Sequence, residues 1–284
     1  MPELNNEWHI WLKENNARGC SAESMVEAMV AAGFDARYAG TIVSAIRTSG
    51  DLEQAVVASQ AIGEYRYEDW PKILLGNRID GGDIWATVAL RCERPQMLVL
   101  DGVLTDEECD EVIDRAQSKL HRSTTVDPLS GEESVIAQRS SDGTFFALNE
   151  DSLIARLDAR IARLMNCPVE NGEGLQILRY GVGGEYRPHF DYFPPSDPGS
   201  LKHIAKGGQR VATMVVYLSN VTQGGATIFP DVGISANPRK GSAVYFRYTN
   251  SHGQIDPLSL HGGAPVEAGE KWIMTKWVRQ RRYN

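Results

Sequence analysis

His189 and Asp191 carry metal-binding side chains and lie two positions apart. Residues i and i+2 of an extended strand point to the same face, so this spacing predicts an imidazole and a carboxylate side by side. A metal ion bound there needs a third ligand, and the later candidates are His203, His252 and His261. Two histidines and one carboxylate on one face leave three coordination positions open, as in non-haem Fe(II) oxygenases. The alternative interpretation is a chance pair on a surface turn.

A lysine in a predicted strand is the second side chain that could take part in binding or catalysis. A strand over Lys271–Val278 would place Lys271, Ile273, Thr275 and Trp277 on one face. If that face lines an apolar interior, the ammonium needs an anion, and a bound carboxylate would satisfy it. The alternatives are a lysine whose ammonium reaches the surface and a tryptophan that only packs in the core.

The segments around these groups predict many short strands. Apolar runs bounded by glycine and proline indicate strands over Met97–Asp101, Leu175–Tyr180, Val211–Leu218, Ala226–Phe229, Ser242–Phe246 and Lys271–Val278. Helices are expected from Thr105, where three acids suit the positive helix end, and near Asp151–Met165. Lys202–Gly208 is expected to be a loop. Helices followed by short strands predict an α+β domain with a β-sandwich or barrel core.

Five motifs occur in one order along the chain. They are Tyr-Gly-x-Gly-x-x-Tyr-x-x-His-x-Asp, Gly-x-Arg-x-Ala-Thr, Gly-Gly-Ala-Thr-x-Phe-Pro, His-x-x-x-Pro-Val and Gly-x-Lys-Trp. Together they resemble the catalytic domain of prolyl 4-hydroxylases, within the Fe(II)- and 2-oxoglutarate-dependent dioxygenases. The resemblance covers roughly residues 95–280. It implies a double-stranded β-helix, or jelly-roll, core with flanking helices.

The resemblance also implies a role for each residue that matches a motif. The iron ligands would be His189, Asp191 and His261. The distal carboxylate of 2-oxoglutarate would bind Lys271, with assistance from Tyr180 and Thr227. The substrate side, near the oxidised carbon, would be lined by Tyr186, Arg210 and Trp277.

The implied activity is hydroxylation of proline in a peptide or protein. The resemblance implies Fe(II), 2-oxoglutarate and O2 as cofactor and cosubstrates, succinate and CO2 as products, and ascorbate as reductant. One alternative is the same chemistry on free proline or another small amino acid, since one fold hosts many substrates. Another is a non-catalytic binding module, against which the intact His189, Asp191, His261 and Lys271 argue.

The first 70 residues predict a separate helical module. They contain 11 Asp and Glu against 5 Lys and Arg, which is more acidic than the rest of the chain. Helices are expected after Ser21 or Ser24, after Asp35 and from Asp51, in an order that resembles a ubiquitin-associated three-helix domain. The predicted organisation is therefore a partner-binding, packing or dimer-forming module at 1–70, a connecting segment at 71–94 and the oxygenase domain at 95–284.

Composition excludes several other classes of protein. Of the 284 residues, 42% are hydrophobic and 23% charged, as in an ordinary globular protein, and no apolar run suits a membrane span. The net charge of −8 argues against nucleic acid as a partner. Four cysteines without a CxxC pair, and a start that does not resemble a signal peptide, predict reduced thiols in the cytoplasm.

Overall fold

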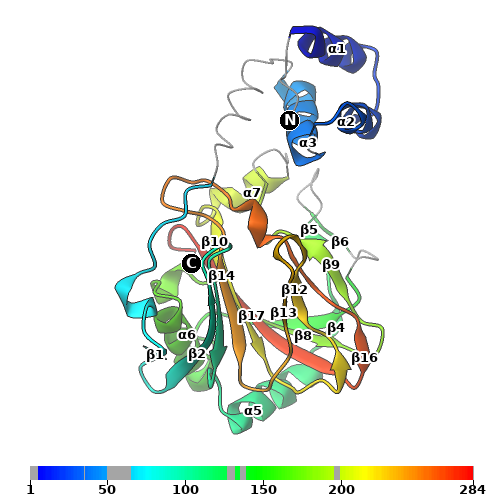
Figure 1. Cartoon of the computed structure of the whole chain (residues 1–284). Coiled ribbons are helices and arrows are strands. Elements are labelled where there is room, and N and C mark those ends of the chain that lie inside the picture. The colour runs from blue at the N-terminus through cyan, green and yellow to red at the C-terminus, as the bar shows by residue number, and fades with distance from the viewer. Residues whose placement is uncertain are drawn as a thin grey trace. The chain divides into compact units, whose positions relative to one another are not determined.

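The computed structural model describes residues 6–34, 36–49, 65–126, 132–134, 139–194 and 199–283. The chain divides into two compact units, Met1–Tyr65 and Arg66–Asn284. Figure 1 shows the first unit as a small group of helices and the second as a sheet-rich core. None of the described helices is long and apolar enough to cross a membrane.

The N-terminal unit contains the helices α1 (Asn6–Ala17), α2 (Ala22–Ala31) and α3 (Ala36–Ser49). The predicted cap is confirmed, because the side chain of Ser21 accepts a hydrogen bond from the Ser24 backbone N–H at the start of α2. Buried side chains from all three helices form the core of the unit, among them Leu12, Met29 and Ile42. The sequence reasoning did not anticipate α1, and the helix expected from Asp51 lies outside the described residues.

The core unit has the helices α5 (Asp106–Gln117), α6 (Ser152–Leu164) and α7 (Ser200–Ala205), with single 3-10 turns η1 (Lys72–Leu74), η2 (Val169–Asn171), η3 (Pro230–Val232) and η4 (Pro257–Ser259). The predicted start of α5 is confirmed by a capping box between Thr105 and Glu108. Asp151 caps α6 by accepting from the backbone N–H groups of Leu153 and Ile154. Buried apolar side chains of both helices, such as Val112 of α5 and Leu157 of α6, pack in one core with those of the large sheet.

That sheet is antiparallel, and its nine described strands run in the order β1-β2-β3-β14-β10-β17-β8-β7-β4. Their bounds are β1 (Arg78–Asp80), β2 (Trp85–Cys92), β3 (Met97–Asp101), β4 (His121–Arg122), β7 (Asp142–Phe146), β8 (Leu175–Tyr180), β10 (Arg210–Tyr217), β14 (Ala243–Arg247) and β17 (Lys271–Arg279). The six predicted strands are confirmed to within one residue at each end, five of them in this sheet.

A four-stranded sheet, β13-β12-β15-β9, faces the large sheet on the side away from α5 and α6 (Figure 1). Its strands are β9 (Tyr186–His189), β12 (Thr227–Phe229), β13 (Ile234–Ala236) and β15 (His261–Gly263). Two small pairs complete the core, β5 (Thr125–Val126) with β6 (Glu133–Ser134) and β11 (Gln223–Gly224) with β16 (Val266–Ala268). This is the α+β jelly-roll architecture that the resemblance implied.

Alternating side chains of the central strands divide between two apolar cores. On β17, Met274 packs with the helices, whereas Ile273 packs between the two sheets. β10 alternates in the same way, with Val216 toward the helices and Tyr217 toward the second sheet. Every residue of β17 is buried for this reason, and the face that begins with Lys271 lines the interior between the sheets.

Two predicted boundaries are wrong. Residues 71–94 are not a connecting segment, because β1 and β2 extend the large sheet: β2 pairs with β3, whose apolar run needs a neighbour on each edge. Residues 66–70 also belong to the core unit, where the Trp70 side chain is buried.

Lys202–Gly208 was expected to be a loop, but most of it lies in α7 and the turn that ends this helix.

Candidate active site

Three of the predicted site residues converge at one end of the interior between the two sheets. β9 and β15 pair antiparallel, and this register places His189 directly opposite His261. Asp191 follows β9 by two residues, and one ligand atom from each of the three side chains lies within 4.8 Å of the others. Each imidazole Nε2 is 3.5 Å from a different oxygen of the Asp191 carboxylate. The three groups therefore surround one point, as ligands of a single metal ion would.

Backbone hydrogen bonds orient both imidazoles for metal binding. Nδ1 of His189 lies 2.9 Å from the carbonyl oxygen of Arg187, and Nδ1 of His261 lies 3.0 Å from that of Ser259. A carbonyl oxygen can only accept, so Nδ1 carries the hydrogen in each ring. This leaves the Nε2 lone pair of each ring directed toward Asp191. Hydrogen bonds from Nδ1 to a backbone carbonyl oxygen are typical of histidines that bind a metal through Nε2.

The protonation states of the ligand side chains also suit a divalent cation. Burial would raise the pKa of Asp191, but the nearby His261 and His189 outweigh it and hold this pKa well below its usual range. Burial lowers the pKa of His261 to about 4, so this imidazole is neutral at neutral pH. The hydroxyl of Thr213 donates to Asp191 Oδ2 at 2.7 Å and fixes the carboxylate further. Two imidazoles and one ionised carboxylate, with open positions beside them, form a donor set that fits Fe(II).

His203 and His252, the other candidates for the third ligand, lie elsewhere. The ring of His203 stacks on Phe193, with centroids 5.0 Å apart. His252 lies in the loop after β14, where its backbone N–H donates to Asn250. Neither belongs to the cluster of metal-ligating groups found among the described residues.

Lys271 points into the same interior. Its side chain is 3% exposed, and its Nζ is 5.5 Å from the ring centroid of Tyr180 and 6.0 Å from that of Tyr217. Among the described residues, no hydrogen bond or ion pair reaches this ammonium, and burial lowers its pKa to about 8. A buried cation without an anion is a costly arrangement. The site therefore fits a ligand carboxylate such as the distal one of 2-oxoglutarate.

Tyr180 neighbours this lysine in the large sheet, and Thr227 lies in the four-stranded sheet that faces it. Tyr180 is directly opposite Lys271 on the neighbouring strand β8, and burial raises the pKa of its hydroxyl, which therefore stays protonated. Thr227 pairs with Gly263, and a Cβ added to this glycine would be only 3.6 Å from Lys271 Nζ. The hydroxyl of Tyr217 donates to Thr227 Oγ1 at 2.7 Å and orients it. Assistance by Tyr180 and Thr227 to a bound carboxylate, which the resemblance implies, stays a prediction.

Comparison with known proteins decides the family. Residues 175–279 match the profile of the 2OG-Fe(II) oxygenase superfamily. Prolyl 4-hydroxylase 2 of Arabidopsis thaliana is 40% identical over 206 residues, which are 65% of this chain and 67% of the relative. Probable prolyl 4-hydroxylase 8 of the same plant is 38% identical over 229 residues, 74% of this chain and 77% of the relative. The chain belongs to the prolyl 4-hydroxylase family.

A solved structure supports the fold of this prolyl 4-hydroxylase family member. The viral collagen prolyl hydroxylase of Paramecium Bursaria Chlorella virus-1, in its 2OG complex, aligns with a TM-score of 0.51 at 29% identity. The alignment covers 64% of this chain and 95% of the viral protein. Nearly the whole viral protein therefore matches about two thirds of this chain, as expected if the two share the jelly-roll core.

The residues predicted for the substrate side of this prolyl 4-hydroxylase family member lie next to the metal ligands. The ring of Tyr186 stacks on His189 with centroids 3.6 Å apart. The Arg210 guanidinium lies 4.0 Å from the Trp277 ring, and its Nη1 donates to the Asp191 carbonyl oxygen at 3.3 Å. The indole N–H of Trp277 is buried and has no acceptor among the described residues. Their roles toward a substrate stay predictions.

Several contributing residues were missed by the sequence reasoning. Glu173 accepts two hydrogen bonds from Arg210, at 2.7 and 2.9 Å, and so neutralises it. Thr213 and the Tyr248 hydroxyl, 3.0 Å from it, support the Asp191 carboxylate. Arg139 lies 4.9 Å from the Tyr186 ring. Thr213 had a signal, because it ends the motif Gly-x-Arg-x-Ala-Thr. Glu173, Tyr248 and Arg139 lie outside the five motifs, and their contacts join segments that are distant in sequence.

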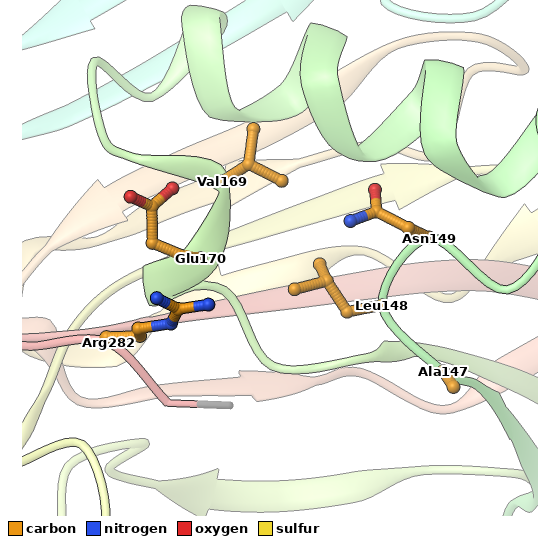
Figure 2. A pocket seen from close by; sticks show the side chains of 6 residues that line it. All are labelled: Ala147, Leu148, Asn149, Val169, Glu170 and Arg282. Carbon is orange, nitrogen blue, oxygen red and sulfur yellow. The ribbon is translucent and has the colours of Figure 1, made fainter.

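A surface cleft lies apart from this site, between the loop after β7 and η2 (Figure 2). It is lined by Ala147, Leu148, Asn149, Val169, Glu170 and Arg282. Figure 2 shows Glu170 and Arg282 close together on one side of it. The lining contains none of the predicted site residues, so this cleft does not belong to the active site of the hydroxylase.

Proposed function

We propose that this chain hydroxylates proline, at carbon 4, within a peptide or protein. The observation that carries the proposal is the convergence of His189, Asp191 and His261 in the same interior as the unpaired ammonium of Lys271. Membership of the prolyl 4-hydroxylase family gives the reaction class. Bound Fe(II) and 2-oxoglutarate would supply the oxidising chemistry, with O2 consumed and succinate and CO2 released.

The protein residues have distinct tasks in this reaction. His189, Asp191 and His261 would hold the metal on one face and leave its other positions accessible. Lys271 would form a charge-assisted hydrogen bond to the distal carboxylate of 2-oxoglutarate and thereby set the direction from which the keto acid reaches the metal. The apolar and aromatic lining between the sheets would exclude water from these contacts.

The substrate side supports a peptide rather than a free amino acid. A free amino acid would need a cation for its carboxylate, but the Arg210 guanidinium beside the metal ligands is already paired with Glu173. The orphaned indole N–H of Trp277 instead suits a neutral acceptor, such as a peptide carbonyl oxygen. Free proline and other small amino acids remain the alternative substrates against which the proposal is tested.

The deciding experiment measures product by mass spectrometry after incubation with Fe(II), 2-oxoglutarate and either a proline-containing peptide or free proline. We expect one added oxygen atom on the peptide and none on free proline. His189→Ala and His261→Ala should abolish this product, whereas His252→Ala, a matched change outside the metal cluster, should retain it. Product from free proline alone would favour the small-molecule alternative, and no 2-oxoglutarate turnover with any substrate would favour a non-catalytic module.

We further propose ascorbate as the reductant that keeps the iron ferrous, and a protein contact or homodimer formed through the N-terminal helices. Cytoplasmic location stays a prediction that rests on the sequence. The dependence of turnover on ascorbate and the molar mass in solution test the first two directly.

A further inference from the structure

Exposed cations gather on helix α7 and on the segment that ends β17. Residues 199–210 and 279–284 contain Lys and Arg residues but no Asp or Glu, in a chain with a net charge of −8. We call the exposed cations Lys202, Lys206 and Arg281 the basic rim. Arg282 lies beside Glu170 in the cleft of Figure 2 and is not part of it. Such a concentration of one charge runs against the composition of the whole chain.

The two segments form one continuous surface. The Arg281 backbone N–H donates to the Gly207 carbonyl oxygen at 2.9 Å. The Lys206 ammonium lies 4.7 Å from the ring centroid of Tyr283. A Cβ at Gly207, whose φ is +73°, would be 3.0 Å from the Tyr283 ring, so glycine permits the close approach. Lys206 and Arg281 are thereby held on the same face of the molecule.

This surface adjoins the metal centre. The Gln209 side chain clamps the Phe193 backbone, accepting from its N–H at 2.8 Å and donating to its carbonyl oxygen at 2.6 Å. Phe193 follows Asp191 by two residues, and its ring stacks on His203 of α7. The Arg210 guanidinium is 4.8 Å from the same ring. The rim therefore begins on the side of the metal centre where Arg210 and Trp277 lie.

The charges beneath the rim do not cancel it. Glu173 is shared by two guanidinium groups, with Nε of Arg210 at 2.7 Å and Nε of Arg279 at 2.6 Å from its Oε1. Arg279 also donates through Nη1 to the carbonyl oxygens of His203 and Gly208, so these buried groups add no net negative charge beneath the rim. Asp197 is the only acid in the sequence between Asp191 and Arg210, so the region stays basic overall. A basic surface beside a catalytic centre attracts acidic ligands and steers their approach.

We propose that the basic rim binds carboxylates that flank the target proline, so that the preferred substrate is a proline in an acidic peptide segment. This inference rests on the proposed function. An extended peptide advances about 3.3 Å per residue, so side chains a few residues from the proline can reach a surface that adjoins the metal centre. Because the rim is exposed, it acts mainly on peptide binding and hardly on the turnover of bound peptide.

The test uses the full chain and three peptides of equal length with one proline, flanked by Glu, by Gln or by Lys. An exposed ion pair changes affinity by about 1.5-fold to 5-fold, so several pairs should lower KM for the Glu peptide by about 10-fold relative to the Gln peptide. Added salt should reduce this difference, while kcat at saturating peptide stays the same. The Lys peptide should have the highest KM.

Charge reversal of the rim sharpens the test. Lys206→Glu/Arg281→Glu should invert the order, so that the Lys peptide has the lowest KM. Glu170 lies beside Arg282 in Figure 2, which is why Lys206 and Arg281 are the residues to change. Lys206→Gln/Arg281→Gln should only reduce the differences in KM between the three peptides. This variant replaces Lys206→Glu/Arg281→Glu in the test if the latter folds poorly. Lys119→Glu, an exposed cation after α5, is the matched control and should leave the order unchanged.

The possible outcomes separate this inference from the function on which it rests. Equal KM values for the three peptides overturn the inference and leave the hydroxylase assignment intact. If Lys206→Glu/Arg281→Glu still has its lowest KM for the Glu peptide, the acidic side chains bind elsewhere on the protein. That result overturns the role of the rim. If no peptide is hydroxylated, the proposed function fails and the inference fails with it.

Discussion

Lys271 and Tyr180 are direct partners across the antiparallel strands β17 and β8, and the lysine ammonium lies 5.5 Å from the tyrosine ring centroid. Five residues further along the same strand, Lys276 is buried on the opposite face. Its ammonium contacts the carboxylate of Asp158 at 2.6 Å and the carbonyl oxygen of Glu173. One strand thus carries two buried lysines, and among the described residues only Lys276 has an anionic partner.

Lys271→Met should raise the requirement for 2-oxoglutarate without destabilising the fold. A hydrogen bond to a charged group contributes about 1.5–3 kcal/mol, so KM for 2-oxoglutarate should rise by about 10-fold to 150-fold. The free energy of unfolding should stay constant or increase, because a buried cation without a partner is removed. Steady-state kinetics and urea denaturation measure the two quantities. An unchanged KM would remove Lys271 from the cosubstrate pocket.

Lys276→Met is the matched control on the other face of β17. It leaves Asp158 buried and without its lysine partner, which should lower the free energy of unfolding by about 3–5 kcal/mol. At a temperature where the protein stays folded, KM for 2-oxoglutarate should be unaffected. If both variants change KM equally, the effect is structural and carries no information on the carboxylate site.

Cosubstrate binding should weaken at alkaline pH. Burial lowers the pKa of Lys271 to about 8 from the usual value near 10.5, so the ammonium is present below pH 8 and lost above it. KM for 2-oxoglutarate should therefore rise as pH increases from about 8 to about 10. Stability has the opposite dependence. Between pH values of about 8 and 10.5, Lys271 is protonated in the unfolded chain but not in the folded one, so its titration makes the free energy of unfolding increase with pH.

The control for this pH dependence is Lys271→Arg, whose guanidinium stays charged throughout the range. The variant should show a KM for 2-oxoglutarate that hardly changes between about pH 7 and pH 10. A wild-type KM that is flat across the same range would contradict the assigned role of the ammonium.

Thr213→Val should weaken metal binding, because the hydroxyl of Thr213 orients the Asp191 carboxylate. Loss of such an outer hydrogen bond typically costs about 10-fold to 100-fold in metal affinity. Calorimetric titration with Mn2+ measures the metal affinity of each protein directly. Thr144→Val is the matched control, since Thr144 is a buried strand residue opposite Ile177, which packs in the helix-side core. Equal affinities of the two variants would exclude a role for Thr213.

Two truncations test where the catalytic unit begins. Removal of residues 1–65 should leave kcat and KM unchanged, because the chain divides between Tyr65 and Arg66. Removal of residues 1–70 should lower stability by about 3 kcal/mol or more, since it deletes the buried Trp70 and the Tyr67 hydroxyl that donates to Asp256 at 2.9 Å. Thermal unfolding compares the two proteins. Equal free energies of unfolding for the two truncated proteins would show that residues 66–70 do not stabilise the core unit.

Local pattern was sufficient for the central strands and for part of the site. Met97–Asp101 and Leu175–Tyr180 are apolar runs between turn residues, and both match β3 and β8 in the structure. The i and i+2 spacing of His189 and Asp191 predicts two ligands on one side because a strand has a fixed two-residue repeat. The caps of α2 and α5 are also local, since a side chain bonds to a backbone group three residues away.

Only the tertiary structure decided which distant residues complete these local features. From residue types alone the third ligand was one of three histidines, and the resemblance pointed to His261; the pairing of β9 with β15 brings it opposite His189. The pairing of Glu173 with Arg210, and the support of Asp191 by Thr213, join residues far apart in sequence. Periodicity describes which face a side chain takes on its own strand. It does not contain the register between strands, and that register is what assembles the metal centre and separates Lys271 from Lys276.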